Sequence, residues 1–476
     1  MFITTPEYDE KDIETQAYLT PAGRRHNHAT AGGILEADDG VPRRKGIFAP
    51  LWKAMAWFDR FGVEARGIER VPEDDRPHTS WWDNGTLWFS VNSCVGTFSV
   101  GYLGHLYYGM GLRDAALTIV FFNLLSCAPV AYMCTFGKEL GLPLTPSRSV
   151  LLAMNTIGGV SCWRAISTTH QIPVVAAAVV LTLLALIVSF CGYKFIHLYE
   201  KFAGYPVLIA FLAGAWGPNG PVEAAGVLTF GCAIVGYAIG WVGFAADFTV
   251  SMPKETSTKK LFWVTFWGLT IPLIFIELMG ALAVTTFSAR PDWEEILAGG
   301  FGKFLLVILG LSTVAVNTPN VYIFTNTFHA LSPYCQAIPR PFIALIVSII
   351  YAALAAAGAD SFSAVLEYLL LFLAYWLAMY FGIVATEHLV FRKNSFDNYA
   401  PDDYTNWRML PLGVAGFFAL GLGWTGAALG MNTSWFIGPI AKRIGGGGDV
   451  GFELAFGFAV TTFIPLRYFE KKYWGH

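Results

Sequence analysis

The chain has 476 residues, of which 55% are hydrophobic and only 14% are charged, and its formal net charge is −3. This composition excludes an ordinary soluble protein, whose water-facing surface requires more polar and charged side chains. We therefore expect an integral membrane protein that has the lipid bilayer as its surroundings and no nucleic-acid partner.

The first 80 residues differ from the rest of the chain. They carry 11 of the 31 Lys and Arg residues and contain no apolar stretch long enough for a signal peptide or a span. Residues 1–80 are predicted to form a partly disordered cytoplasmic tail. The transmembrane transporter domain is expected over 81–470, and a cytoplasmic C-terminus over 471–476.

Apolar runs of the length that crosses a bilayer follow one another from Leu87 to Phe469. They predict an all-α membrane protein with about twelve transmembrane helices. The expected ranges are 84–106, 114–135, 150–168, 172–193, 203–216, 225–250, 261–288, 302–329, 341–358, 363–388, 410–430 and 450–469. Cytoplasmic loops collect Lys and Arg. This topology gives 14 of them to the inner loops and five to the outer loops, which predicts that both termini are cytoplasmic.

The first helix contains the sequence WFSVNSCVGTFSVGYLG, in which four small or polar residues gather at mid-depth. They are Asn92, Ser93, Gly96 and Thr97. A broken helix is tolerated in a bilayer only where it lines a buried cavity or pathway. The alternative is that the glycines only allow neighbouring helices to pack closely.

The sixth helix contains FGCAIVGYAIGWVGFAADFTV, with four glycines and, in its second half, Trp241, Phe244 and Asp247. Paired Gly-interrupted helices in corresponding positions of two halves indicate an inverted-repeat transporter with its site at the midplane. Helices one to five and six to ten would then form a five-plus-five inverted repeat with broken helices 1 and 6, followed by two C-terminal helices.

The eighth helix contains LSTVAVNTPNVYIF, in which Pro319 removes a backbone hydrogen bond and Asn317 and Asn320 share one face. Trp163 and Trp241 fall inside predicted spans, although tryptophans in membrane proteins concentrate at the interfaces. Two indole faces and two amides would suit a planar heterocycle such as a nucleobase. A sugar remains open, as does a structural role for the amides in repairing the proline kink and for the indoles in packing.

No phosphate-binding loop or cofactor fingerprint is present, so we expect no cofactor and an ion gradient as the source of energy. A buried carboxylate at Asp247 could couple proton entry to substrate binding, with sodium as the less favoured ion. The alternative places Asp247 at the cytosolic end, solvated or paired with Lys254 or Lys259. Glu277 and Glu367 are interpreted as ties between helices.

The spans contain no metal-ligand cluster and no nucleophile with a paired base, so neither a metal site nor an enzyme is predicted. The sequence carries no signal for a particular oligomeric state.

The chain resembles the fungal purine-cytosine permease branch of the nucleobase cation symporter family 1. The matching stretches are ARGIERVPEDDRPHTS, the broken first helix, SFCGYKFIHLYEKFAGYPVLIA, GWVGFAADFTV, AVNTPNVY, ATEHLVFRK, WFIGPIAKRIG and GDVGFELAFGFAV. The resemblance implies import of cytosine and purines with protons across the plasma membrane. The residues to which it assigns roles in the site are Trp163, Trp241, Asp247, Asn317, Pro319 and Asn320.

This chain departs from the family pattern in two helices. Val316 replaces the first of two asparagines before Pro319, and Ser167 replaces an asparagine after Trp163, with Arg164 between them. These departures favour two alternatives to nucleobase import. One is transport of another small heterocycle, pyridoxine or an allantoin-like compound, and the other is a transport-inactive, sensor-like relative.

Overall fold

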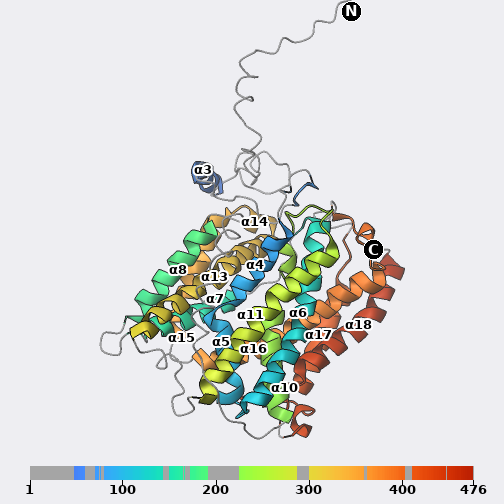
Figure 1. Ribbon diagram of the computed structural model, residues 1–476. Coiled ribbons are helices and arrows are strands. Elements are labelled where there is room, and N and C mark those ends of the chain that lie inside the picture. The colour runs from blue at the N-terminus through green and yellow to red at the C-terminus, as the bar shows by residue number, and fades with distance from the viewer. Residues whose placement is uncertain are drawn as a thin grey trace, which may run out of the picture.

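The computed structural model of the protein is a bundle of helices (Figure 1). The structure describes residues 48–58, 70–73, 76, 80–142, 149–164, 166, 172–190, 224–286, 300–358, 362–401, 410–445 and 447–474. The major helices are α4 (Trp81–Asn92), α5 (Val95–Leu106), α6 (Leu112–Leu140), α7 (Ser149–Arg164), α8 (Val174–Phe190), α10 (Ala224–Ile239), α11 (Thr258–Thr286), α13 (Gly300–Ala330), α15 (Arg340–Gly358), α16 (Phe362–Thr386), α17 (Val414–Gly430) and α18 (Gly451–Trp474).

Several short elements connect or extend these helices. They are α3 (Phe48–Phe58), α14 (Pro333–Gln336), the 3₁₀ turns η4 (Ala245–Phe248), η7 (Phe396–Asn398) and η9 (Ala441–Arg443), and the π turn η6 (Glu387–Phe391). Strands β1 (Asn432–Thr433) and β2 (Phe436–Ile437) form a small antiparallel pair in which Asn432 lies opposite Ile437.

Eleven of the twelve predicted spanning helices correspond to helices of the structure, and the predicted fifth, 203–216, lies outside the described residues. The first is divided into α4 and α5. The sixth is α10, which ends at Ile239 and continues as turns and η4 instead of a helix. Five helices in the described part are long and apolar enough to cross a membrane.

The contacts between helices follow the pattern expected if helices one to five and six to ten are two inverted repeats. Helix α11, the seventh span, packs on α5 of the first, and α6, the second span, packs on α10 of the sixth. Likewise, α13 packs on α8 while α7 packs on α15. If each helix is replaced by its counterpart in the other repeat, the α11–α5 contact becomes the α6–α10 contact, and the α13–α8 contact becomes the α7–α15 contact. An inverted repeat requires this correspondence. Helices α17 and α18 form a pair that packs on α16.

Glycines permit the closest contacts in the bundle. A Cβ added at Gly101 of α5 would overlap the Glu277 carbonyl group of α11, and one at Gly236 of α10 would overlap the Leu370 carbonyl group of α16. Lipid tails are as apolar as leucine, so membrane helices associate through such close packing instead of a hydrophobic driving force. Gly101 and Gly236 lie within continuous helices and not at the breaks, so at these two positions the packing interpretation applies.

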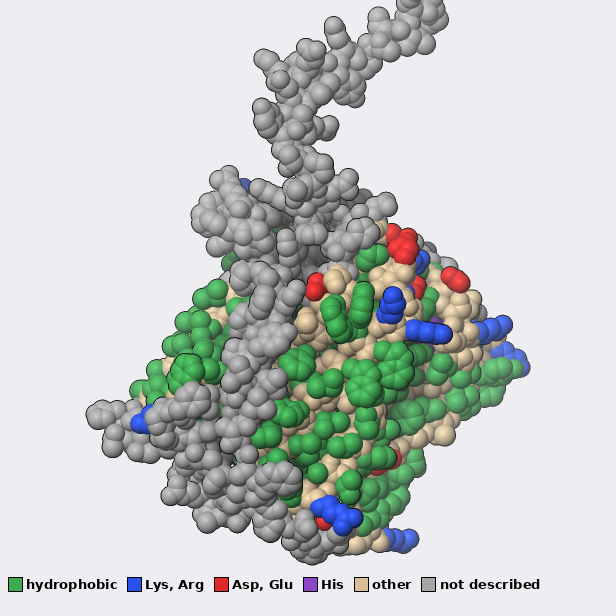
Figure 2. All heavy atoms as spheres, viewed as in Figure 1, with side chains coloured by type: hydrophobic (Ala, Val, Ile, Leu, Met, Phe, Trp, Pro, Cys, Tyr) green, Lys and Arg blue, Asp and Glu red, His purple; other side chains and the backbone are tan. Residues whose placement is uncertain are grey.

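The exterior of the bundle is apolar, as a bilayer requires. Figure 2 shows hydrophobic side chains over the middle of the visible face and charged side chains toward its ends. At one end, Arg76 donates to the Lys138 carbonyl oxygen, Lys254 pairs with Glu73 at 3.0 Å, and Arg467 pairs with Glu387 at 2.9 Å.

Part of the predicted N-terminal tail is ordered against this same end. Helix α3 lies beside the α13–α15 connection (Figure 1), where the Trp52 indole donates to the Ala337 carbonyl oxygen at 2.6 Å. Trp52 is 1% exposed and Met55 is fully buried. This helix was not predicted from the sequence.

Candidate functional site

The interruption of the first spanning helix is two residues long. Helix α4 ends at Asn92 and α5 begins at Val95, while Cys94 between them is extended, with φ −141° and ψ 167°. The Thr97 hydroxyl donates to the Asn92 carbonyl oxygen at 2.6 Å, and the Val95 backbone N–H donates to Ser312 Oγ of α13 at 3.1 Å. Side chains therefore replace part of the helical hydrogen bonding that the break removes, which is what a bilayer demands.

Asn92 joins the two broken helices. Its Oδ1 accepts a hydrogen bond from Trp241 Nε1 at 3.1 Å, and its Nδ2 donates to the Trp88 carbonyl oxygen at 2.8 Å. The Trp241 ring meets Trp88 edge-on, with centroids 5.6 Å apart, and meets Phe244 edge-on at 5.4 Å. Three predicted site residues, Asn92, Trp241 and Phe244, thus lie together, and all are buried.

Tyr237 of α10 completes this contact from the other side of the break. Its hydroxyl lies 3.0 Å from Thr97 Oγ1 and 3.3 Å from Cys94 Sγ. A Cβ added at Gly96 would lie 3.1 Å from the Tyr237 hydroxyl and 3.2 Å from Asn155 Oδ1. Gly96 therefore leaves room for polar groups from two other helices to approach α5.

A second polar group joins the third and eighth spanning helices. Asn155 Nδ2 of α7 donates to Asn317 Oδ1 of α13 at 3.1 Å, and Asn317 Nδ2 donates to Thr156 Oγ1 at 2.9 Å. All three residues are buried. Because Asn155 also borders Gly96, the two polar groups meet at the break and form one cluster, which we call the break cluster. Its members are Asn92, Thr97, Asn155, Thr156, Tyr237, Trp241 and Asn317.

Pro319 does not end its helix, since α13 runs from Gly300 to Ala330. Asn320 Nδ2 donates to the Val316 carbonyl oxygen at 2.8 Å, one turn back. This bond fits the predicted structural role, in which an amide side chain repairs the hydrogen bonding near the proline, but it uses only the Nδ2 group of Asn320. Asn320 is 4% exposed, and its Oδ1 has no hydrogen-bond partner among the described residues. A buried acceptor of this kind can receive a hydrogen bond from a ligand.

Trp163 is not part of the break cluster. Its Nε1 donates to the Val307 carbonyl oxygen at 3.3 Å, and its ring covers Gly310. It lies eight residues beyond Asn155 on α7, about 12 Å at 1.5 Å per residue. The described contacts of Trp163 are therefore with α13, and the pairing of its indole with that of Trp241 around a flat ring stays a prediction. Ser93 lies at the break, and its hydroxyl donates back to the Phe89 carbonyl oxygen at 2.7 Å.

Asp247 follows the sixth-helix break on η4 and is 1% exposed. The segment is held against α6, because Thr249 Oγ1 donates to the Cys134 carbonyl oxygen at 2.7 Å. The alternative of a solvated Asp247 does not fit this burial. Lys254, one of the two lysines considered as its partner, lies outside the bundle and pairs with Glu73.

Glu277 of α11 is a second buried carboxylate, with an exposure of 0%. Its Oε2 accepts from Asn123 Nδ2 of α6 at 2.7 Å, whereas Oε1 has no hydrogen-bond partner in the described part of the chain. Gly101 of α5 lies directly over its backbone. By contrast, Glu367 accepts from the Tyr108 hydroxyl at 2.6 Å. Both acids tie helices together as expected, but Glu277 also keeps one carboxylate oxygen unused.

A family model for permeases of cytosine/purines, uracil, thiamine and allantoin matches residues 70–150 and 145–438. Purine-cytosine permease fcyB of Emericella nidulans is 36% identical over 460 residues, covering 87% of this chain and 90% of that one. Vitamin B6 transporter TPN1 of Saccharomyces cerevisiae is 25% identical over 553 residues, covering 94% and 96%.

The chain belongs to this permease family. The predicted membership in the purine-cytosine permease branch is confirmed, and the protein is a multi-pass membrane permease, not an enzyme. The closed structure of Mhp1, a nucleobase-cation-symport-1 family transporter with bromovinylhydantoin bound, superimposes with a TM-score of 0.61 at 16% identity. The superposition covers 86% of the permease and 95% of Mhp1, and it confirms the predicted fold.

Four residues in or beside the break cluster were not predicted from the sequence: Asn155, Thr156, Tyr237 and Ser312. Tyr237 could have been found, because it lies in the glycine-rich run of the sixth helix. Asn155 could have been found as an amide in the third helix. Ser312 gives no local signal, since its role depends on a backbone N–H of another helix.

The departures from the family pattern lie in different surroundings. Val316 is buried and supplies the carbonyl oxygen to which Asn320 donates. Arg164 ends α7 and is half-buried, while Ser167 lies outside the described residues. The permease therefore has a buried asparagine in its third helix, Asn155, although it lies before Trp163 in the sequence instead of after it.

Proposed function

We propose that the permease imports purine bases and cytosine together with protons across the plasma membrane, with both termini in the cytoplasm. The observation that carries the proposal is the break cluster, which gathers amide, hydroxyl and indole groups where the two broken helices meet. The 36% identity with a purine-cytosine permease over most of both chains supports the substrate class.

The chemistry of the break cluster suits the edge of a nucleobase. Purines and cytosine present both hydrogen-bond donors and acceptors, and an amide side chain can bond to both, because it has an acceptor oxygen and a donor NH₂ group. Asn155 and Asn317 now bond to each other and to Thr156, so a base entering there would exchange these bonds for its own. The open Oδ1 of Asn320 adds an acceptor, and the Trp241 ring adds an aromatic surface beside Asn92.

Proton coupling needs a group that holds a proton in one stage of the cycle and releases it in another. Asp247 is the first candidate, because it is buried on the segment that follows the sixth-helix break. Glu277 is the second, because a carboxylate with one unused oxygen is costly to bury as an anion. A sodium gradient is the alternative source of energy.

Identity favours purines and cytosine over other heterocycles. The permease is 36% identical to fcyB but 25% identical to the vitamin B6 transporter TPN1. Pyridoxine or an allantoin-like compound is therefore the second substrate class. A transport-inactive, sensor-like protein would retain binding without flux.

The test is uptake of radiolabelled cytosine and adenine in cells that lack endogenous nucleobase uptake, at external pH 5 and pH 7. We expect saturable uptake that is faster at the acidic pH and is abolished by Asn320→Ala. Asn326→Ala is a matched control, because Asn326 is a buried amide six residues farther along the same helix. Surface abundance is measured for every variant.

Absence of cytosine and adenine uptake at normal surface abundance would refute the proposed substrates. Competition by pyridoxine would then identify the second substrate class, whereas binding without flux would identify the sensor-like alternative. Uptake that depends on sodium and not on pH would retain the substrate and overturn the coupling ion.

A further inference from the structure

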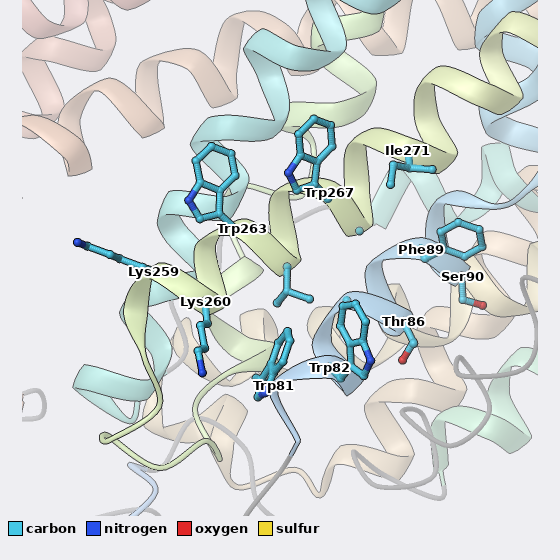
Figure 3. A pocket seen from close by; sticks show the side chains of 13 residues that line it. Trp81, Trp82, Thr86, Phe89, Ser90, Lys259, Lys260, Trp263, Trp267 and Ile271 are labelled. Atoms are coloured by element: carbon cyan, nitrogen blue, oxygen red, sulfur yellow. The ribbon is translucent and has the colours of Figure 1, made fainter.

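A groove on the outside of the bundle lies between α4 and the beginning of α11. It has a volume of about 710 Å³ and no part in the break cluster. Two pairs of tryptophans line it, Trp81 and Trp82 from α4 and Trp263 and Trp267 from α11 (Figure 3). Lys259 and Lys260 also line it.

The floor of the groove is formed by a close helix contact. A Cβ added at Gly268 would lie 2.7 Å from the Gly85 carbonyl oxygen, so the two backbones approach without intervening side chains. The tryptophans then stand on both sides of this contact and leave an apolar trough between them. Trp82 is 62% exposed and Trp263 is 54% exposed, as expected for rings at a lipid interface.

One end of the groove is positively charged. Lys259 and Lys260 begin α11 and are both exposed (Figure 3). No ion pair involves either of them within the described part of the chain, whereas the nearby Lys254 pairs with Glu73. The N-terminus of the 29-residue helix α11 adds its positive dipole at the same place. Among the described residues that line the groove, none is acidic.

We propose that this groove binds an anionic phospholipid, with its negatively charged headgroup at Lys259 and Lys260 and an acyl chain along the tryptophan-lined trough. Aromatic rings at headgroup level and basic residues beside a span are the features that retain such lipids.

The size and charge of the groove favour a lipid over a protein. A volume of about 710 Å³ lies in the range of small-molecule pockets, whereas a stable interface between proteins needs about 800 Å² from each partner. A second copy of this chain would bring the same two lysines, Lys259 and Lys260, to a symmetric contact. The two like charges would then repel each other.

Binding can be measured on the purified, full-length permease in nanodiscs of phosphatidylcholine alone and with added phosphatidylserine. We expect phosphatidylserine to raise the melting temperature and to remain bound in native mass spectrometry. Each lysine near the membrane surface contributes about fivefold to the affinity for anionic lipid, so Lys259→Gln with Lys260→Gln should weaken retention by roughly 30-fold.

Two controls separate a built site from general surface charge. Lys471→Gln with Lys472→Gln removes two adjacent lysines from the end of α18 and should leave the response unchanged. Lys259→Arg with Lys260→Arg should retain the response to phosphatidylserine, because both positive charges are kept. Single substitutions at Lys259 and Lys260 give the same comparison if the double variant melts abnormally in phosphatidylcholine alone.

Equal loss in both lysine-to-glutamine pairs, or unchanged lipid retention in Lys259→Gln with Lys260→Gln, would overturn the proposal. A dimer that dissociates in Trp263→Ala, without bound anionic lipid, would assign the groove to a second copy. The proposed orientation places the groove at the cytoplasmic leaflet, but the binding assay does not depend on it, because a nanodisc offers both leaflets.

Discussion

The two halves of the first spanning helix are held in different ways. Every residue of α5 from Val95 to Gly104 is buried, and Gly101 brings its backbone against that of α11. Helix α4 begins with exposed tryptophans, and its Gly85 meets the Val264 side chain. Both halves approach the α11 backbone, α5 at Gly101 and α4 where Gly85 lies against Gly268. The break therefore separates a half that is buried over Val95–Gly104 from a half whose first turn is exposed.

The largest expected effect is that of Gly101→Ala, which attacks the enclosed half. The added Cβ overlaps the Glu277 carbonyl group, so α5 and α11 must separate. Such overpacking costs about 1 to 3 kcal/mol or more. We expect little correctly folded protein, measured by size-exclusion profile and melting temperature after purification. A normal profile and melting temperature would show that α5 and α11 can accommodate the added methyl group without loss of stability.

A large effect on transport, with little on folding, is expected from neutralising one buried carboxylate. The two carboxylates lie near different halves of the first spanning helix. The Glu277 backbone contacts Gly101 of α5. Asp247 is next in the chain to Phe248, whose ring meets Trp88 of α4 edge-on at 5.5 Å. We expect Asp247→Asn to keep substrate binding but to lose acid-stimulated accumulation, measured by uptake at pH 5 and pH 7.

Glu277→Gln is the matched variant. If it alone loses acid stimulation while retaining binding, the coupled proton belongs to the enclosed half of the helix and Asp247 is structural. If both variants remain stimulated by acid, neither carboxylate couples the proton.

An intermediate effect is expected at the junction between the two halves. Ser312→Ala removes the acceptor of the Val95 N–H and leaves a buried donor without it, which costs about 1 to 3 kcal/mol. The melting temperature should fall. Thr318→Ala is the control, because its hydroxyl bonds only within α13, to the Val314 carbonyl oxygen at 2.7 Å. Equal shifts in both variants would mean that the junction bond adds no stability.

The smallest effect is expected from Gly85→Ala in α4. The new Cβ would lie 2.7 Å from Val264 Cγ2 and 3.4 Å from the Val264 carbonyl oxygen, so the overlap is with a side-chain methyl group and not with the backbone. Alanine favours a helix by about 1 kcal/mol over glycine, which offsets part of the cost of this contact, so stability should fall by less than in Gly101→Ala. A loss as large as that of Gly101→Ala, in the same melting assay, would erase the difference between the halves.

The sequence allowed the fold and the position of both helix breaks to be predicted, because glycines and amides in apolar runs are exceptions to a simple pattern. Residues 92–97 and 240–247 mark the two interruptions, and the structure places both there. Burial of Asp247 could not be decided from the sequence, because it lies only seven residues before Lys254. The contact of η4 with α6 is what encloses it.

The partners within the site were less predictable. Whether Trp163 faces Trp241 depends on the register of α7 against α13, which is set by contacts such as Asn155 with Asn317 and Gly159 with Thr313. A single amide or hydroxyl in an apolar helix shows no period that would reveal this register. The same reason explains why Asn155 and Ser312 were missed.

The described part of the N-terminal segment contacts one end of the bundle at two places. The Trp52 indole donates to Ala337 in the link between α13 and α15, and Arg76 donates to the Lys138 carbonyl oxygen near the end of α6. Loss of α3 would therefore release the link between α13 and α15 from the N-terminal segment and leave the contact on α6 intact.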